Sequence, residues 1–295
     1  MALIDLHSHS HYSHDGDTAP ARLVEMAAAK HITHLAVTDH NRIEANAEAL
    51  RAGEKLGVAV IPGVELDCHY KEANLHLLGY CIDFHDKRYP ELWEGIRARK
   101  IDNNLVRLRL VRELGFAVDD SVMNETRDGV LPGVAIADHI LAHPKNAGMP
   151  ELEPFRPGGA KAENPVIQFC WTYLTKGNPG YVEDGSLTLD EAVKLIVSTG
   201  GVPVLAHPGS SIPEHEDYLP EIVAAGVAGV EVFCGYHSPE TAERWRGLAG
   251  AENAFITCGS DYHGKMKPAI ALGVHGGDAF EREILENALQ LHACG

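Results

Sequence analysis

Short apolar runs alternate with amphipathic helical patterns through the first 83 residues and again from residue 186 onward, and this alternation limits the possible folds most strongly. Such an order of strands and helices is typical of a parallel sheet, either open or closed into a barrel. A chain of 295 residues is long enough for one large α/β barrel, or for a core with a smaller appended domain. The expected strands are Leu3–Leu6, Leu35–Thr38, Val58–Ile61, Glu65–His69, Leu75–Tyr80, Val202–Ala206, Gly229–Phe233 and Phe255–Cys258.

The alternation stops between residues 84 and 185. A long helical pattern covers Glu91–Leu114, and shorter helices are expected at Val134–His143 and Val166–Leu174. The Gly- and Pro-rich stretch between the two shorter helices has the length of a functional or mobile loop. We therefore predict a small helical domain, serving as a lid or specificity element, inserted into a barrel. The three predicted segments are residues 1–83, 84–185 and 186–295.

Composition excludes several classes of protein. The chain has 25 Lys and Arg against 42 Asp and Glu, a formal net charge of −17, which argues against a surface that binds duplex DNA. No apolar run reaches the length of a membrane span, and the first residues lack the pattern of a secretory signal. The six cysteines are scattered without paired spacing, which indicates reduced thiols. We therefore expect a cytoplasmic protein.

Histidine and carboxylate side chains lie at or just after almost every expected strand. Because the carboxyl ends of the strands in an α/β barrel open on one face, these side chains are expected to meet at one mouth. The i, i+2 spacing of His7 and His9 directs both imidazoles to the same face of an extended chain. The complete set is His7, His9, Asp15, His40, Glu65, His76, His207, Asp261 and His263.

A single histidine at a strand end more often satisfies a hydrogen bond than binds a metal. When residues that can bind metal follow so many strands of one chain, a metal site is the favoured interpretation. Nine ligands exceed the three or four that one zinc ion uses, so we expect two or three divalent ions, with Glu65 or Asp261 as a bridging carboxylate. Imidazole-rich sites suit manganese, zinc or iron better than magnesium. Several such ions in one pocket suit hydrolysis of a phosphate ester by an activated water molecule.

Eight of these nine side chains, all except Asp15, stand in six short motifs. These are Asp5–Ser10 (DLHSHS), Thr38–Asn41 (TDHN), Gly63–Glu65 (GVE), Leu75–Gly79 (LHLLG), Leu205–Gly209 (LAHPG) and Gly259–Gly264 (GSDYHG). With these motifs in this order, the chain resembles the polymerase and histidinol phosphatase (PHP) domain, a family of metal-dependent phosphoesterases. The resemblance implies a distorted (βα)7 TIM-like barrel that holds a trinuclear metal site.

The resemblance also implies how the ligands are shared among the ions. One ion is expected on His7, His9, Glu65 and Asp261, a second on Glu65, His76 and His207, and a third on Asp15, His40 and His263. The loop Ser13–Gly16 is one residue longer than the family's Ser-Asp-Gly, so His14 is an alternative to Asp15.

Within that family, the insertion resembles a subgroup that acts on small nucleotides, including 3′,5′-nucleotide bisphosphate phosphatases and enzymes that trim short RNA. The likeness is greatest over Phe169–Val182, whereas the subgroup's Arg-x-His is absent from Pro132–His139. The expected reaction is hydrolysis of a phosphomonoester of an AMP-like or 3′,5′-bisphosphate nucleotide, with phosphate as product. The alternatives are a phosphodiesterase or 5′-3′ exonuclease acting on short oligonucleotides, and a metal-binding regulatory module without turnover.

Substrate contacts are expected from polar and basic residues near the mouth. Asn41 and Arg42 follow His40 directly, and Arg99 and Lys100 lie in the basic part of the long helical pattern. Arginine matches phosphate oxygens with two parallel hydrogen bonds. His237 follows an expected strand and is a candidate to bind phosphate or to protonate the leaving oxygen, with simple packing as the alternative. Asp261 and His263 complete the expected catalytic set.

Overall fold

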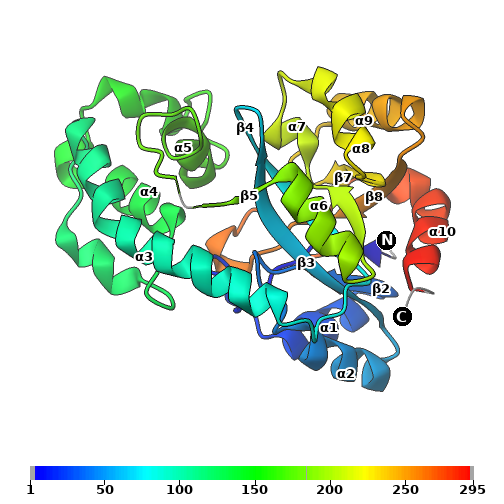
Figure 1. The fold of residues 1–295 in the computed structure, drawn as a ribbon. Coiled ribbons are helices and arrows are strands. Elements are labelled where there is room, and N and C mark those ends of the chain that lie inside the picture. Colours follow the sequence, from blue (N-terminus) through cyan, green and yellow to red (C-terminus); the bar gives the residue numbers. More distant parts are fainter. Residues whose placement is uncertain (1–3, 184, 293–295) are drawn as a thin grey trace. The chain divides into compact units, whose positions relative to one another are not determined.

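The computed structural model describes residues 4–183 and 185–292, and the chain divides into two compact units (Figure 1). The first unit comprises the residues up to Trp93 and those from Leu187 onward, and the second unit comprises Glu94–Ser186. The predicted insertion begins at residue 84, ten residues before the second unit. The difference arises because one uninterrupted helix, α3 (Arg88–Glu113), begins in the first unit and continues into the second. The use of the insertion as a lid stays a prediction.

The first unit is built on a sheet with the strand order β1-β2-β3-β4-β6-β7-β8, in which β5 pairs with β3 off this path. The sheet closes because the Leu6 N–H donates to the Cys258 carbonyl (3.0 Å) and Ser8 forms a parallel bridge with Tyr262. The expected distorted barrel is confirmed. The strands are β1 (Ile4–Asp5), β2 (His34–Val37), β3 (Ala59–Tyr70), β4 (Ala73–Tyr80), β5 (Leu187–Thr188), β6 (Val202–Leu205), β7 (Gly229–Cys234) and β8 (Phe255–Gly259). Leu3, included in the first expected strand, lies outside the described residues.

Two features of the sheet differ from the expected parallel arrangement. The separate strands expected on either side of Pro62 form the single strand β3, because its backbone pairing continues without a break, with β2 up to Pro62 and with β4 from Gly63 onward. Strand β4 pairs antiparallel with both β3 and β6, because β3 and β4 are joined by a tight turn and have no helix between them. Glu65 and His76 therefore lie inside strands and not at their ends.

Helices of the first unit pack against the strands and bury one continuous apolar core, to which Leu6, Leu66, Leu77, Val204 and Val230 contribute. A smaller cluster lies where α1 and α2 cover β2 and β3. The helices are α1 (Pro20–Ala29), α2 (Asn46–Leu56), α6 (Leu189–Ser198), α7 (Pro208–Ser211), α8 (Leu219–Ala224), α9 (Pro239–Ala251) and α10 (Glu281–His292), with short 3-10 helices η4 (Glu216–Tyr218), η5 (Gly264–Met266) and η6 (Asp278–Phe280).

The second unit has a core of its own. Phe169 and Ile136 are fully buried beside Leu108 and Phe116. The stretch that was expected to be a loop between the two shorter helices contains two 3-10 helices. After α3, the helical elements are η1 (Asp120–Glu125), α4 (Gly133–Ala142), η2 (Pro144–Asn146), η3 (Pro150–Phe155) and α5 (Pro165–Tyr173).

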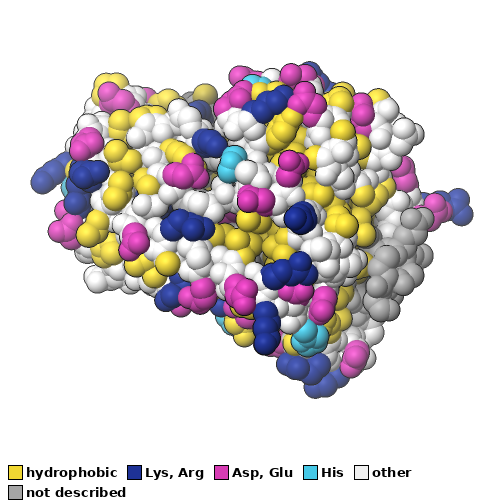
Figure 2. Space-filling view, viewed as in Figure 1, with side chains coloured by type: hydrophobic (Ala, Val, Ile, Leu, Met, Phe, Trp, Pro, Cys, Tyr) yellow, Lys and Arg dark blue, Asp and Glu magenta, His cyan; other side chains and the backbone are white. Residues whose placement is uncertain are grey.

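The surface and the thiols agree with the composition. On the face shown in Figure 2, acidic and basic side chains are interspersed with apolar ones. Within the described part of the chain, no helix combines the length and the apolar character needed to cross a membrane. The five cysteines among the described residues form no disulfide, and Cys294 lies outside those residues.

Candidate metal centre

Backbone contacts at one end of the barrel fix the direction of the first two imidazoles. The Ser8 hydroxyl donates to the Ala36 carbonyl (2.8 Å), which turns Ser8 toward the neighbouring strand and His7 and His9 away from it. The rings of His7 and His9 lie 5.2 Å apart between centroids. Gly259 ends β8 where a Cβ atom would overlap the Cβ of His7, so the close approach of these two segments requires glycine.

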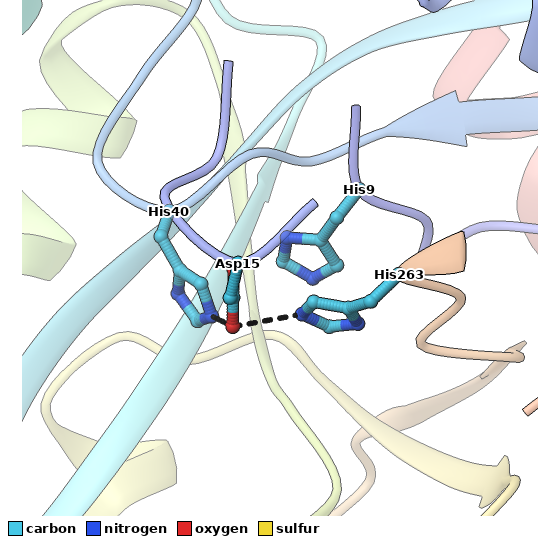
Figure 3. Close-up of side chains that lie close together, drawn as sticks. All are labelled: His9, Asp15, His40 and His263. Carbon is cyan, nitrogen blue, oxygen red and sulfur yellow. Dashed lines mark ion pairs between the residues drawn. The ribbon is translucent and has the colours of Figure 1, made fainter. Parts of the chain in front are cut away.

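The structure brings all nine predicted ligands together. Within each group of candidate ligands, one atom from every residue lies within 4.8 Å of the others. Figure 3 shows the group in which the Asp15 carboxylate stands between His40 (3.7 Å) and His263 (3.2 Å), with His9 beside them. The groups are His7, His9, Glu65 and Asp261; His9, Asp15, His40 and His263; Glu65, His76 and His207; and His40, Asp67 and His76.

Glu65 connects these groups through its two oxygens. Oε1 lies 2.8 Å from His76 Nδ1 and 3.3 Å from His207 Nε2. Oε2 lies 3.2 Å from His7 Nε2, 3.1 Å from His9 Nε2 and 3.3 Å from His40 Nδ1. A carboxylate placed in this way can bridge cations that occupy neighbouring groups.

Hydrogen bonds on the outer side of three imidazoles set their tautomers. His7 Nδ1 lies 3.0 Å from Glu231 Oε1, and His263 Nδ1 lies 2.7 Å from the Asp261 carbonyl. Because a carboxylate and a carbonyl only accept, both Nδ1 atoms carry the proton, and the Nε2 lone pairs face the centre. His207 Nδ1 lies 2.9 Å from the Ser211 hydroxyl, which donates to the His207 carbonyl (3.5 Å) and so can accept the Nδ1 proton. Metal-binding histidines characteristically have such outer partners.

The donor set fits divalent cations. His9 Nδ1, Glu65 Oε2 and His263 Nε2 are buried without a hydrogen-bond partner among the described residues. A buried polar atom left in this state costs about 1–3 kcal/mol, so the site needs a partner that accepts electron pairs. Imidazole nitrogen and carboxylate oxygen are ligands for zinc, iron and manganese.

The pKa shifts show how much negative charge is concentrated here. Burial disfavours the protonated form of His40, yet the carboxylates of Glu65, Asp15 and Asp67 raise its pKa to about 10. Burial also disfavours the ionised form of Glu65, but the surrounding imidazoles hold its pKa well below the usual range. For His263 burial prevails and lowers the pKa to about 4. A cation bound here would replace protons held by the cluster.

The longer loop places Asp15, rather than His14, among the candidate ligands. Ser13 Oγ donates to Asp15 Oδ1 (2.6 Å), which leaves Oδ2 directed at His263 and His40. The ring of His14 lies 5.5 Å from that of His40, and His14 belongs to none of the ligand groups found among the described residues.

The backbone is strained at this end of the barrel. His207, Asp261 and Asn41 have φ angles of 26°, 57° and 57° although none of them is glycine. Such conformations cost roughly 1–3 kcal/mol each and concentrate at functional sites.

Sequence reasoning missed two carboxylates that contact the ligands. Glu231 is fully buried inside β7, where it contacts His7 and accepts the His207 N–H (2.9 Å). A glutamate within an apolar strand was the available signal. Asp67 lies 3.1 Å from His40 Nδ1, and its i, i+2 spacing from Glu65 was the corresponding signal.

The residues predicted to bind substrate have other partners in the structure. Asn41 donates to Asp67 Oδ2 (2.8 Å) and accepts its N–H (3.0 Å), so the amide positions Asp67. Arg42 donates to Glu44 (2.6 Å), and its guanidinium lies 5.5 Å from the Tyr12 ring and 5.1 Å from the Trp93 ring.

His237 is engaged at both ring nitrogens. Nδ1 donates to the Val232 carbonyl (2.7 Å), and Nε2 accepts the Gly209 N–H (3.0 Å). The ring therefore holds the loop after His207, which agrees with the packing alternative, and its role in proton transfer stays a prediction. Arg99 and Lys100 lie in the second unit, where Arg99 donates to the Gly185 carbonyl (3.2 Å) and Lys100 is buried.

Comparisons with known proteins agree with this geometry. A family model described as the PHP domain matches residues 5–106. The chain is 30% identical over 271 residues to a 3′,5′-nucleoside bisphosphate phosphatase from Chromobacterium violaceum, covering 89% of this chain and 88% of that protein. It is 29% identical over 267 residues to a phosphoribosyl 1,2-cyclic phosphate 1,2-diphosphodiesterase from Eggerthella lenta, covering 89% and 94%. The solved structure of an amidohydrolase from Chromobacterium violaceum, with bound sulfate and no metal, matches with a TM-score of 0.74 and 27% identity, covering 93% of this chain and 91% of that one.

Proposed function

Because the chain belongs to the PHP-domain family of metal-dependent phosphoesterases, we propose that it hydrolyses a phosphomonoester of a small nucleotide and releases inorganic phosphate. An AMP-like nucleotide or a 3′,5′-bisphosphate nucleotide is the proposed substrate. The Chromobacterium violaceum relative named as a bisphosphate phosphatase supports this choice.

One observation carries the proposal. Glu65 is fully buried, and its two oxygens lie within 3.3 Å of five imidazole nitrogens from segments distant in the chain. A buried carboxylate needs positive partners, which protonated imidazoles supply in the metal-free protein and bound cations would supply in their place. The overlapping ligand groups around it support two or three divalent ions, with manganese, zinc or iron favoured over magnesium.

The residues of the chain prepare the site for hydrolysis. When bound, divalent ions withdraw charge from phosphoryl oxygens and lower the pKa of water toward neutrality. Glu231 and the Asp261 carbonyl keep the lone pairs of His7 and His263 directed inward. Asn41 donates a hydrogen bond to Asp67 and so fixes the Asp67 carboxylate beside His40. The use of water as nucleophile removes the need for a serine or cysteine nucleophile.

A phosphodiesterase is the second candidate, and a 5′-3′ exonuclease acting on short oligonucleotides belongs to this class. The Eggerthella lenta relative, named as a diphosphodiesterase, favours it.

The Arg-x-His expected of bisphosphate phosphatases is absent from Pro132–His139. We therefore expect AMP to be hydrolysed at least as well as a nucleoside 3′,5′-bisphosphate.

A substrate panel tests the proposal. The protein is freed of metal, reloaded with manganese, zinc or iron, and assayed with p-nitrophenyl phosphate, bis(p-nitrophenyl) phosphate, AMP and adenosine 3′,5′-bisphosphate, with and without EDTA. Turnover of the monoesters that EDTA abolishes is the expected result. Turnover of the diester alone would support the second candidate, and no turnover by the metal-loaded protein would support a regulatory module.

A further inference from the structure

A lysine that the proposed mechanism does not use lies against the ligand cluster. Lys267 follows η5, four residues after His263. Its Nζ donates to Asp261 Oδ2 (3.1 Å) and to the Tyr236 hydroxyl (3.1 Å). The Tyr236 hydroxyl donates to the same Asp261 oxygen (2.5 Å). The Lys267 side chain is 13% exposed, so it is largely desolvated.

The two oxygens of Asp261 face different partners. Oδ1 lies 2.9 Å from His9 Nε2 and 3.2 Å from His7 Nε2, within a candidate ligand group. Oδ2 holds Lys267 and Tyr236. A divalent ion held through Oδ1 would share the one negative charge that retains the ammonium. Since like charges repel strongly where water is excluded, metal loading would weaken the attachment of Lys267 to Asp261.

Stability alone does not explain this arrangement. Desolvating an ammonium and a carboxylate costs about as much as their attraction returns, so a buried ion pair is a weak source of stability. Lysine carries three donors on a flexible four-carbon stem, and can exchange one anionic partner for another by a small rotation. Phosphate is an anion that lysine binds well.

We propose that Lys267, steadied by Tyr236, binds the phosphate group of the substrate when the centre holds its metal ions. This inference rests on the proposed phosphoesterase function and adds a residue to it. Tyr236 contacts ligands of two different groups. Its hydroxyl donates to Asp261, and its ring centroid lies 6.1 Å from that of His207. In this role Lys267 supplies a positive charge to the phosphoryl oxygens, while Asp261 remains a metal ligand.

Lys267 differs from Arg42, the basic residue that the sequence favoured in the same unit. The guanidinium of Arg42 is held by Glu44 and lies beside two aromatic rings. Arg99 and Lys100, in the second unit, stay predicted substrate contacts. Lys267 is in the same unit as the ligands and directly contacts one of them.

Variants of the manganese-loaded full-length protein test this role. Lys267→Met removes the charge, Lys267→Arg keeps it, and Lys265→Met is the control because Lys265 is a nearby exposed lysine. The measurements are the Kd of inorganic phosphate by calorimetry, manganese content by elemental analysis, and kcat and KM for p-nitrophenyl phosphate. We expect Lys267→Met to keep its manganese and to bind phosphate at least about tenfold more weakly, with a higher KM. Lys267→Arg and Lys265→Met are expected to bind phosphate as the wild type does, within about threefold.

Two results would overturn the inference. An unchanged phosphate Kd in Lys267→Met would show that Lys267 does not bind phosphate. Loss of manganese in step with phosphate binding would show that Lys267 only orients Asp261. If Lys267→Met fails to fold, the Kd of Lys267→Gln, which keeps a polar side chain without the charge, decides between the same results. Failure of the proposed function itself is distinguished by the wild type, which would then hydrolyse none of the esters in the panel.

Discussion

Replacing Glu65 by glutamine tests the ligand cluster at the residue that connects its parts. The substitution preserves shape but removes the negative charge that five imidazoles share. Glu65 belongs to two of the candidate ligand groups, so its loss weakens both at once. Metal ions contribute several kcal/mol to stabilising a phosphoryl transition state, so we expect kcat/KM to fall by roughly 10²–10³-fold or more.

The assay combines p-nitrophenyl phosphate hydrolysis with elemental analysis of Glu65→Gln protein dialysed against manganese. We expect the loss of at least about one equivalent of metal together with the loss of activity. Glu25→Gln is the control, because the Glu25 side chain is 53% exposed on α1, where it pairs with Arg22. Full manganese content and activity within about threefold of the wild type would refute the assignment of Glu65 as a shared ligand.

Three further outcomes are expected. Glu231→Gln leaves His7 without its carboxylate partner and should weaken manganese affinity about tenfold to a hundredfold; an unchanged affinity would show that Glu231 does not orient His7. Because the carboxylates around His40 raise its pKa to about 10 in the metal-free protein, manganese binding near neutral pH should release protons, and affinity should increase with pH up to that value. Calorimetry in two buffers of different ionisation enthalpy measures the release, and equal heats would contradict it. Ile136→Ala in the second unit should lower the free energy of unfolding by about 2–5 kcal/mol in a denaturant titration, whereas a loss below about 0.5 kcal/mol would show that Ile136 is not part of a packed core.

Most of the barrel could be predicted from the sequence because alternation and local spacing are local signals. The apolar runs of β6, β7 and β8 are visible without knowledge of the fold. The antiparallel direction of β4 could not be predicted in this way, because no residue within the strand specifies which neighbour it pairs with. The available signal was the short stretch between the expected strands Glu65–His69 and Leu75–Tyr80, because a parallel crossover needs about a dozen or more residues.

The candidate ligands could be proposed because all except Asp15 lie in short motifs, and the structure brings these motifs together. The residues that hold the ligands were harder to find, since a second partner is chosen by distance in space. Glu231 contacts His7 across 224 positions of the chain. Lys267 can be connected with the site only because its ammonium contacts Asp261 in the structure. For Asn41 the sequence predicted substrate binding from its place beside His40, and the structure adds that its amide holds Asp67. Its contact with substrate stays a prediction.

The most direct test of the metal centre is a titration of the metal-free protein with manganese while phosphate release from AMP is followed. The account predicts no hydrolysis before manganese is added, a rate that rises with bound metal, and saturation at about two to three equivalents. Hydrolysis that proceeds equally well in EDTA, or a fully loaded protein that releases phosphate from neither AMP nor p-nitrophenyl phosphate, would contradict it.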